Sequence, residues 1–440
     1  MPINEKQTFS VLTQSLAKNL TVDYLTREDA LDILQVKRST LYSYVSRGLI
    51  RCIKLNGNAL SHYSLEDIKR LKAKSSARAG HGPVAAGAMR WGDPVILTSI
   101  TAITPDGPRY RRRLATDIVR SNVPFEVVTE YLWTGHWNDG PVVWQNEDIP
   151  STVPQSLEAV FQLHPNIHIL QLLAQATMSI GISESSLLDR NELSRTDVLS
   201  ARRLISAMTG VFGFLGPTKS YVMPLAGESI ADTLARSLGL SADPVVICAL
   251  NSALVLVADH ELNPATFAAR IAASWGAQFH SCISAALDVH YGIGKGCDRV
   301  EALFSSSPQP EDVVAKVLEK IEQGQRLEGF SHRLYPLGDP RSKVLMKLAH
   351  ENGPYHLPTQ SILKALQALE NKCSIYPNIE TGLVLISRSL NLAPQAAGAL
   401  FALGRSAGWV AHILEQRLAG FEIRPRAQFT DPYEGINHHG

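Results

Sequence analysis

Apolar residues recur at three- and four-residue spacing along much of this chain, whereas strand-like alternation is scarce. That spacing gathers apolar side chains on one face of a helix. The pattern therefore predicts an all-α core. The expected helices cover residues 199–214, 228–238, 244–258, 264–289, 311–323, 343–351, 360–371 and 395–418. Interruptions are expected at Pro217, Pro224 and Pro244, across 292–296 and across 336–340, and polar residues gather in those loops.

The composition is that of a large protein without a membrane anchor. Of the 440 residues, 45% are hydrophobic, which is enough for more than one packed domain. No apolar run reaches the ~20 residues that a membrane helix needs, and the first ten residues lack the apolar core of a signal peptide. A cytoplasmic location is therefore expected. The five cysteines are scattered and form no CxxC pair, so neither a disulfide framework nor a zinc site is predicted.

Charge is distributed unevenly along the chain. Residues 1–80 carry a net charge of +6 and the remaining residues a net charge of −5. Residues 72–90, KAKSSARAGHGPVAAGAMR, contain small residues and no acid, a composition typical of a flexible linker. The sequence therefore predicts a small N-terminal domain over residues 1–75, a linker over 76–90 and a large domain over 91–440.

The N-terminal segment has the pattern of a winged helix-turn-helix. Thr26 followed by Asp29 has the form of a capping box for a first helix, while Ser39 can cap a second helix and Gly48 can end it. Asn56-Gly57-Asn58 is a hairpin signal between two further segments and predicts a wing. The run LTREDALDILQVKRSTLYSYVSRGLIR resembles the DNA-binding domain of the MerR regulator family.

This resemblance implies that the second helix enters a major groove of DNA. The residues expected to lie nearest the bases and phosphates are Arg38, Ser39, Thr40, Tyr42, Arg47 and Lys54. The alternative is a docking or purely structural appendage, because a surplus of +6 is modest for a nucleic-acid binder.

The most specific chemistry lies in GFSHRLYPLGDPR, residues 329–341. His332 can donate a hydrogen bond to a substrate carbonyl, and Arg341 can hold a carboxylate with two parallel N–H donors. A histidine and an arginine brought together by one Pro- and Gly-containing loop indicate a pocket for a small keto acid.

Three further motifs accompany this loop in a fixed order. They are ADHELN at 258–263, ALGRSAGWVAHILEQ at 402–416 and IRPR at 423–426. Over roughly residues 91–430, the four motifs together closely resemble the citrate synthase family. The resemblance implies a large helical domain, a smaller domain at about 265–385 that closes over the substrate, and a homodimer.

The resemblance also implies a reaction and a set of site residues. Citrate synthases condense acetyl-CoA, and 2-methylcitrate synthases propionyl-CoA, with oxaloacetate, without a metal or other cofactor. By motif match, His260 and His332 would contact oxaloacetate, with His332 polarising the ketone. Arg341 and Arg405 would clamp carboxylates together with Arg424, which the partner subunit would contribute.

Two departures from the family pattern bear on activity. Where the family has a GPxHGG-type loop, whose histidine hydrogen-bonds the enolate, this chain has YGIGKGCDRVEAL. Aligned from the left, Lys295 takes the place of the histidine, whereas alignment from RVEAL puts Lys295 on a glycine, and His290 lies just upstream. Where the family has an aspartate as the proton-abstracting base, YPNIETG supplies Glu380. Both replacements keep a usable functional group.

Three functions agree with this pattern. The first, which the retained residues favour, is an acyl-CoA condensing enzyme with His332, Glu380 and Lys295 as catalytic residues. The second is an impaired homologue that senses a metabolite and regulates DNA binding. The third is an inactive partner that assembles with an active synthase.

Overall fold

The computed structural model describes residues 24–46, 49–54, 61–76, 96–140, 142, 144, 149–185, 193–307, 309–352 and 357–425. The chain forms two compact units. Residues 98–424 make the large unit, and the described residues before 98 make the N-terminal unit together with residue 425.

The described residues of the N-terminal unit form three helices and a three-stranded sheet. Its elements are β1 (Tyr24–Leu25), α2 (Arg27–Leu34), α3 (Arg38–Ser46), β2 (Cys52–Lys54), β3 (Ser61–Ser64) and α4 (Leu65–Ser76). The strands lie in the order β1-β3-β2 and pair in antiparallel fashion. A small core of Ala30, Leu41, Ile50, Tyr63 and Ile68 holds these elements together.

The details of this unit confirm one expectation and correct another. Thr26 caps α2, because its side chain accepts a hydrogen bond from the backbone N–H of Asp29. The helix α3 begins at Arg38, so Ser39 lies inside the helix and does not cap it. Arg47, Gly48, the turn at 56–58 and the linker beyond residue 76 lie outside the described residues, as do any contacts of the Lys54 side chain.

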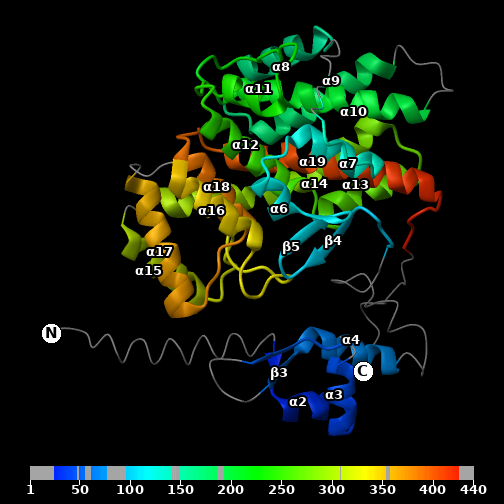
Figure 1. Ribbon diagram of the computed structural model, residues 1–440, viewed down its shortest axis with the longest axis vertical. Helices are drawn as coiled ribbons and strands as arrows, with labels where there is room; N and C mark the ends of the chain where they lie inside the picture. Colours follow the sequence, from blue (N-terminus) through cyan, green and yellow to red (C-terminus); the bar gives the residue numbers. More distant parts are fainter. Residues whose placement is uncertain are drawn as a thin grey trace, which may run out of the picture. The chain divides into compact units, whose positions relative to one another are not determined.

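The large unit is mostly helical, as the spacing predicts (Figure 1). Its helices are α6 (Ala115–Arg120), α7 (Phe125–Thr134), α8 (Thr152–Leu163), α9 (Ile169–Ser185), α10 (Leu193–Gly210), η2 (Val211–Phe214), α11 (Ile230–Ser237), α12 (Pro244–Val257), α13 (Pro264–Ser274), α14 (Phe279–Ser305), α15 (Pro310–Glu322), α16 (Pro340–Asn352), α17 (Leu357–Cys373), α18 (Ile379–Ser389) and α19 (Ala396–Ala419). Of the helices that the structure describes, none is long and apolar enough to cross a membrane.

The expected helical core is accompanied by a short sheet before the first of these helices, which was not predicted. It consists of β4 (Thr101–Thr104), β5 (Gly107–Tyr110) and β6 (Arg113–Leu114), paired in antiparallel fashion. Gly107 follows the two-residue turn with φ +120°, a conformation that glycine adopts at little cost. Strands of two to four residues are too short to show an alternating pattern, so they could not be predicted from the sequence.

Two helix boundaries also differ from the prediction. The expected helix over 264–289 is broken after α13, where Gly276 has φ +72°. Conversely, the expected loop at 292–296 is part of α14, which runs from Phe279 to Ser305 without a break. Cys297, Val300 and Phe304 continue the buried face of that helix, so packing of this face outweighs the cost of the glycines.

The helix α19 lies at the centre of the large unit (Figure 1), and most of its residues are buried. It packs against α7, α12, α13, α14 and α18. At Gly404 and Gly408 a Cβ atom would collide with backbone atoms of residues 254 and 258. These two glycines therefore let α19 approach the carboxyl end of α12 closely, next to His260.

Candidate functional site

The loop that carries His332 is fastened to the start of α18. Ser331 donates a backbone hydrogen bond to Tyr376 at 2.7 Å, and Asn378 donates one to Gly329 at 2.9 Å. The Thr381 hydroxyl also donates to the Gly329 carbonyl, at 2.6 Å. The segment with the expected ketone donor and the segment with the expected base are therefore held side by side.

His332 lies in a cluster with His260 and Tyr335. The ring centroids of His260 and His332 are 5.2 Å apart, and His260 Nε2 lies 3.0 Å from the Tyr335 hydroxyl. The Leu334 N–H donates to His332 Nδ1 at 3.1 Å, so the proton of the neutral imidazole sits on Nε2. Burial, together with the nearby Arg341, lowers the pKa of His332 to about 4. His332 is therefore a neutral N–H donor at physiological pH.

Arg341 is buried in this cluster, but its pairing differs from the expectation. Its Nε and Nη2 donate to the two oxygens of Asp339 at 3.0 and 2.7 Å, and both side chains are almost fully buried. The two parallel donors expected to hold a substrate carboxylate are thus used within the loop. Arg341 Nη1 is buried and has no hydrogen-bond partner among the described residues. This single N–H₂ group is what Arg341 offers to a ligand.

Arg405 approaches the same region from α19. Its Nε donates to the Val257 carbonyl at 2.6 Å, and its guanidinium carbon lies 5.1 Å from the centre of the Phe401 ring. Burial lowers the pKa of Arg405 to about 10, so it remains a cation at neutral pH. Two buried guanidinium groups and two neutral histidines form a cluster whose charge and N–H donors suit a small anion with a carbonyl group.

Glu380 lies in the first turn of α18, which is capped by the Asn378 side chain. Its Oε2 accepts the Gly329 N–H at 3.0 Å. A Cβ atom at Gly296 would collide with the Glu380 carboxylate, so this glycine of α14 provides the space that the longer side chain needs. Burial raises the pKa of Glu380 above its usual value. A half-buried carboxylate with a raised pKa is suited to accept a proton from carbon.

The structure does not bring Lys295 into this cluster. Because 292–296 is helical, Lys295 is exposed on α14, and its ammonium lies 4.7 Å from the centre of the Tyr291 ring. The adjacent Gly296, one residue on, is the position that faces Glu380. The catalytic role assigned to Lys295 stays a prediction, and it needs a rearrangement of this segment.

Arg424 lies on the segment that follows α19. Ile423 donates its backbone N–H to the Ser274 hydroxyl at 3.2 Å, and the Trp275 indole donates to the Ile423 carbonyl at 3.2 Å. These bonds hold the segment beside the carboxyl end of α13. The Arg424 side chain is exposed, and among the described residues it makes no hydrogen bond or ion pair with the cluster.

Some residues of the cluster were not among the predicted site residues. Tyr335 and Asp339 stand in the same loop as His332 and Arg341, and an acid two residues before a buried arginine is a recognisable pairing signal. Tyr335 also lines a cavity of about 690 Å³ that opens between this loop, α6 and the turn after β4. Among the described residues, no group of three or more His, Cys, Asp and Glu side chains is arranged to hold a metal ion.

Buried histidines predict how stability depends on pH. Burial lowers the pKa of His290 from 6.5 to about 3 and that of His332 to about 4. The unfolded chain therefore binds more protons than the folded one as the pH falls below about 6.5. The melting temperature should fall from pH 7 towards pH 4, and His290→Phe should make this fall shallower. A melting temperature that is constant over this range would contradict the neutral state of these residues.

Comparison with known proteins agrees with this geometry. A family model described as the citrate synthase C-terminal domain matches residues 88–426. The chain belongs to the citrate synthase family. Citrate synthase 2 of Bacillus subtilis is 28% identical and the match covers 76% of this chain and 93% of the relative. The citrate synthase of Saccharolobus solfataricus is 29% identical over the same shares.

Solved structures of this family have the same fold. The Thermoplasma acidophilum citrate synthase, in a ternary complex with carboxymethyl coenzyme A and oxaloacetate, matches with a TM-score of 0.68 at 25% identity and covers 78% of this chain and 95% of that one. The Thermotoga maritima citrate synthase matches with a TM-score of 0.63 at 21% identity, covering 78% and 94%, which shows the fold alone. The family resemblance drawn from the four motifs is thus confirmed, and the family match begins at residue 88, after the elements β1 to α4.

Proposed function

We propose that this protein condenses the acyl group of acetyl-CoA or propionyl-CoA with oxaloacetate, giving citrate or 2-methylcitrate and free CoA. The observation that carries the proposal is the set of a neutral His332 N–H donor, the buried Arg341 and Arg405, and the half-buried carboxylate of Glu380 on the neighbouring segment. The Thermoplasma relative, crystallised with oxaloacetate and a CoA derivative, supports these ligand classes.

In this proposal, oxaloacetate is bound by positively charged arginines and by neutral hydrogen-bond donors. His332 Nε2–H donates to the ketone oxygen and polarises the carbon that is attacked. His260 adds a second contact, and its pKa is held well below its usual range by burial and by Arg341. Arg405 and the free Nη1 of Arg341 bind carboxylate oxygens, and Arg424 of the partner subunit completes the clamp.

Glu380 is the base on the acyl-CoA side. It removes a proton from the carbon next to the thioester, and the resulting enolate forms the new C–C bond with the ketone carbon of oxaloacetate. Water then cleaves the thioester and releases CoA. No metal or other cofactor is needed for these steps. Detection of citrate or 2-methylcitrate by mass spectrometry tests the proposal, and the absence of both products from purified protein would contradict it.

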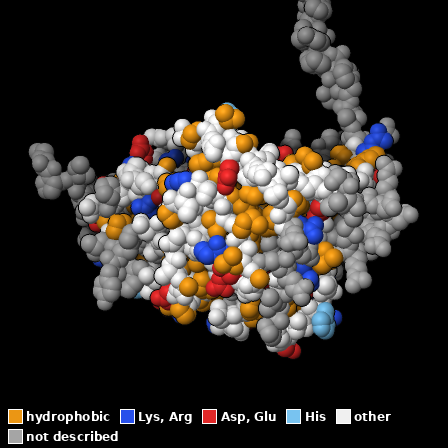
Figure 2. All heavy atoms as spheres, turned by 90° about the horizontal axis from the view of Figure 1, so that it is seen from above, with side chains coloured by type: hydrophobic (Ala, Val, Ile, Leu, Met, Phe, Trp, Pro, Cys, Tyr) orange, Lys and Arg blue, Asp and Glu red, His pale blue; other side chains and the backbone are white. Residues whose placement is uncertain are grey.

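The homodimer expected from the family remains part of this proposal. Figure 2 shows hydrophobic side chains gathered on the face seen from above. Large hydrophobic residues are exposed on α8, α9 and α10, among them Leu163 with 75% and Ile182 with 68% of their surface accessible. A groove between α9 and α14 is lined by apolar residues that include Met178 and Leu287. Exposed apolar area of this kind favours a second subunit.

Mixed dimers test whether Arg424 acts on the partner's site. A subunit with Arg424→Ala and a subunit with Glu380→Gln are each expected to form inactive homodimers. If Arg424 acts across the interface, a mixed dimer purified through two different tags has one intact site and regains activity. If Arg424 acts within its own subunit, both sites of the mixed dimer are defective and activity stays absent.

We further propose that the N-terminal unit binds DNA through α3. Arg38 and Tyr42 are exposed on this helix while Leu41 packs into the core, and Arg38 Nε donates to the Tyr42 hydroxyl at 2.9 Å. This arrangement supports a polar, basic surface along one face. The MerR-like interpretation also includes Ser39, Thr40, Arg47 and Lys54 as contacts.

Fluorescence anisotropy with duplex DNA at low salt tests this second proposal. Binding should weaken as salt rises, because phosphate contacts release counterions. Arg38→Ala with Lys54→Ala should weaken it further, whereas Lys347→Ala and Lys364→Ala on α16 and α17 remove the same charge from the large unit and should not. Absence of binding at low salt would contradict DNA binding and leave a structural appendage. Binding that responds to oxaloacetate would favour the regulator over a simple enzyme.

A further inference from the structure

The carboxyl end of α12, which presents His260, is held by side chains and backbone of other elements. The Tyr110 hydroxyl donates to the Val255 carbonyl at 2.7 Å, Arg405 Nε donates to the Val257 carbonyl at 2.6 Å, and the Gly408 N–H donates to the Ala258 carbonyl at 2.9 Å. The last carbonyls of a helix have no partners within the helix. Here β5 and α19 supply those partners and fix the direction in which the chain leaves α12.

The next residue, Asp259, is fully buried and is held by His412. Its Oδ2 accepts a hydrogen bond from His412 Nε2 at 3.3 Å, and neither side chain is accessible to solvent. A Cβ atom at Gly408 would collide with Asp259 Oδ1, so this glycine makes room for the carboxylate. A buried carboxylate needs such partners to remain ionised.

The protonation of His412 follows from its other neighbour. Arg270 Nη1 lies 3.0 Å from His412 Nδ1. A guanidinium group only donates hydrogen bonds, so Nδ1 must accept and the imidazole proton must sit on Nε2, where it points to Asp259. His412 therefore donates its Nε2–H to the Asp259 carboxylate.

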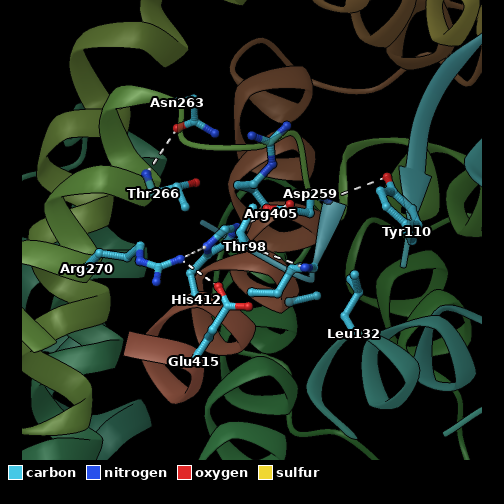
Figure 3. A network of polar contacts seen from close by, with 12 residues as sticks. Thr98, Tyr110, Leu132, Asp259, Asn263, Thr266, Arg270, Arg405, His412 and Glu415 are labelled. Carbon is cyan, nitrogen blue, oxygen red and sulfur yellow. Dashed lines mark hydrogen bonds and ion pairs between the residues drawn. The ribbon is translucent and has the colours of Figure 1, made fainter. Parts of the chain in front are cut away.

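Arg270 is itself held by two residues of α19 besides His412, and Figure 3 shows it beside His412 and Glu415. Its Nε donates to Gln416 at 3.0 Å and its Nη1 donates to Glu415 at 2.7 Å. The other oxygen of Glu415 accepts the N–H and the hydroxyl of Ser99 at 2.8 and 2.9 Å. A continuous set of hydrogen bonds thus runs from Ser99 through Glu415, Arg270 and His412 to Asp259.

Among the described residues Asp259 forms no ion pair with an arginine, but its charge interacts with that of Arg405. Arg405, which is bonded to Val257, lies beside Asp259 in Figure 3. Burial would raise the pKa of Asp259, but His412 and Arg405 outweigh burial and hold it below its usual range. Arg405 and Arg341 are like charges in one pocket, so a fixed anion behind Arg405 offsets their repulsion.

We propose that His412 is a positioning residue for oxaloacetate: it holds the Asp259 carboxylate in place, and Asp259 in turn orients Arg405 and the adjacent His260. His412 touches neither substrate in this arrangement and acts through Asp259. The inference rests on the proposed function, because it concerns the affinity of the same pocket for oxaloacetate. If the network only stabilised the fold, its disruption would lower the melting temperature and leave oxaloacetate affinity unchanged.

A double-mutant cycle measured by calorimetric titration of oxaloacetate tests this. His412→Leu removes the donor and should weaken binding about ten- to a hundredfold, the value of a hydrogen bond to a charged group. His412→Gln keeps an N–H₂ donor and should restore most of the affinity. In an Asp259→Asn background, His412→Leu should change the oxaloacetate affinity little further, because His412 acts only through the Asp259 carboxylate, which is already absent. The value of kcat at saturating oxaloacetate should change much less than KM.

The outcomes separate the inference from the proposed function. No oxaloacetate binding by the unchanged protein would contradict the function itself. Equal oxaloacetate affinity of the unchanged protein and of His412→Leu would overturn the positioning role. Full additivity of the changes in binding free energy caused by His412→Leu and Asp259→Asn would overturn it too. His350→Leu, which removes an exposed histidine of α16, is the matched control and should bind normally. If His412→Leu does not fold, His412→Asn, whose shorter side chain falls short of Asp259, takes its place in the cycle.

Discussion

Replacement of Glu380 by glutamine is expected to lower oxaloacetate-dependent turnover by about 10²–10⁴-fold, the usual contribution of a general base. Glutamine has nearly the same shape and still accepts the Gly329 N–H that the carboxylate accepts at 3.0 Å. It cannot take a proton from carbon. Because oxaloacetate is bound by other residues, its dissociation constant, measured by calorimetric titration, should not change.

The pH dependence of turnover provides a second test of Glu380 as the proton-abstracting base. Burial raises its pKa above 4.5, so the acid limb of kcat/KM should lie above that value, with activity lost as the carboxylate takes up a proton. Glu380→Gln should abolish this limb together with the activity. Equal turnover in Glu380→Gln and the unchanged protein would remove Glu380 from the mechanism.

The length of the side chain at 380 should also matter. The carboxylate occupies the space beside Gly296, so Glu380→Asp withdraws it by one methylene, and a misplacement of ~1 Å can cost about 10²-fold in rate. Gly296→Ala should displace the carboxylate from the opposite side. Gly292→Ala is the matched control on the same helix, because a Cβ atom there meets no neighbour within 4 Å.

Replacement of His332 by leucine is the second change with a large expected effect. Loss of the donor to the ketone oxygen should lower kcat/KM about 10²–10³-fold, the usual loss for one such donor. His332→Gln keeps a donor and should be less impaired. Steady-state kinetics with varied oxaloacetate measure both effects.

The neutral state of His332 makes this prediction specific. Since its pKa is lowered to about 4, protonation of His332 should not limit turnover at any pH above about 5. The wild-type pH profile can be compared with those of the variants. If its acid limb disappears in His332→Gln but persists in Glu380 variants, the limb reports protonation of His332, which would contradict a neutral His332. It would indicate a charged histidine in its place.

Much of the helical core could be predicted from apolar residues at helical spacing. In α15, for example, Val313 and Val317 are buried, and Val314, Leu318 and Ile321 pack against the same core. The nearness of His332 to Arg341 could also be predicted, since one loop carries both. The helical state of residues 292–296 could not be predicted, because three glycines within five residues are typical of a loop. Burial of Cys297 and Val300 against the core decides otherwise.

The pairings within the site were also beyond the sequence. Arg341 and Asp339 are neighbours in the chain, but only their common burial shows that they satisfy each other and leave a single free group. The bond from His412 to Asp259 joins residues more than 150 positions apart, and hydrogen bonds over that range follow from helix packing alone. The family resemblance supplied roles for His260, Arg405 and Arg424 that no local pattern would have shown.

The most direct test is the release of free CoA thiol when purified protein is mixed with acetyl-CoA or propionyl-CoA, with and without oxaloacetate. We predict release that depends on oxaloacetate and falls to background in Glu380→Gln and nearly so in His332→Leu. Thiol release that is absent with both acyl-CoA substrates, while oxaloacetate still raises the melting temperature, would contradict condensation and indicate a pocket that only binds its ligand.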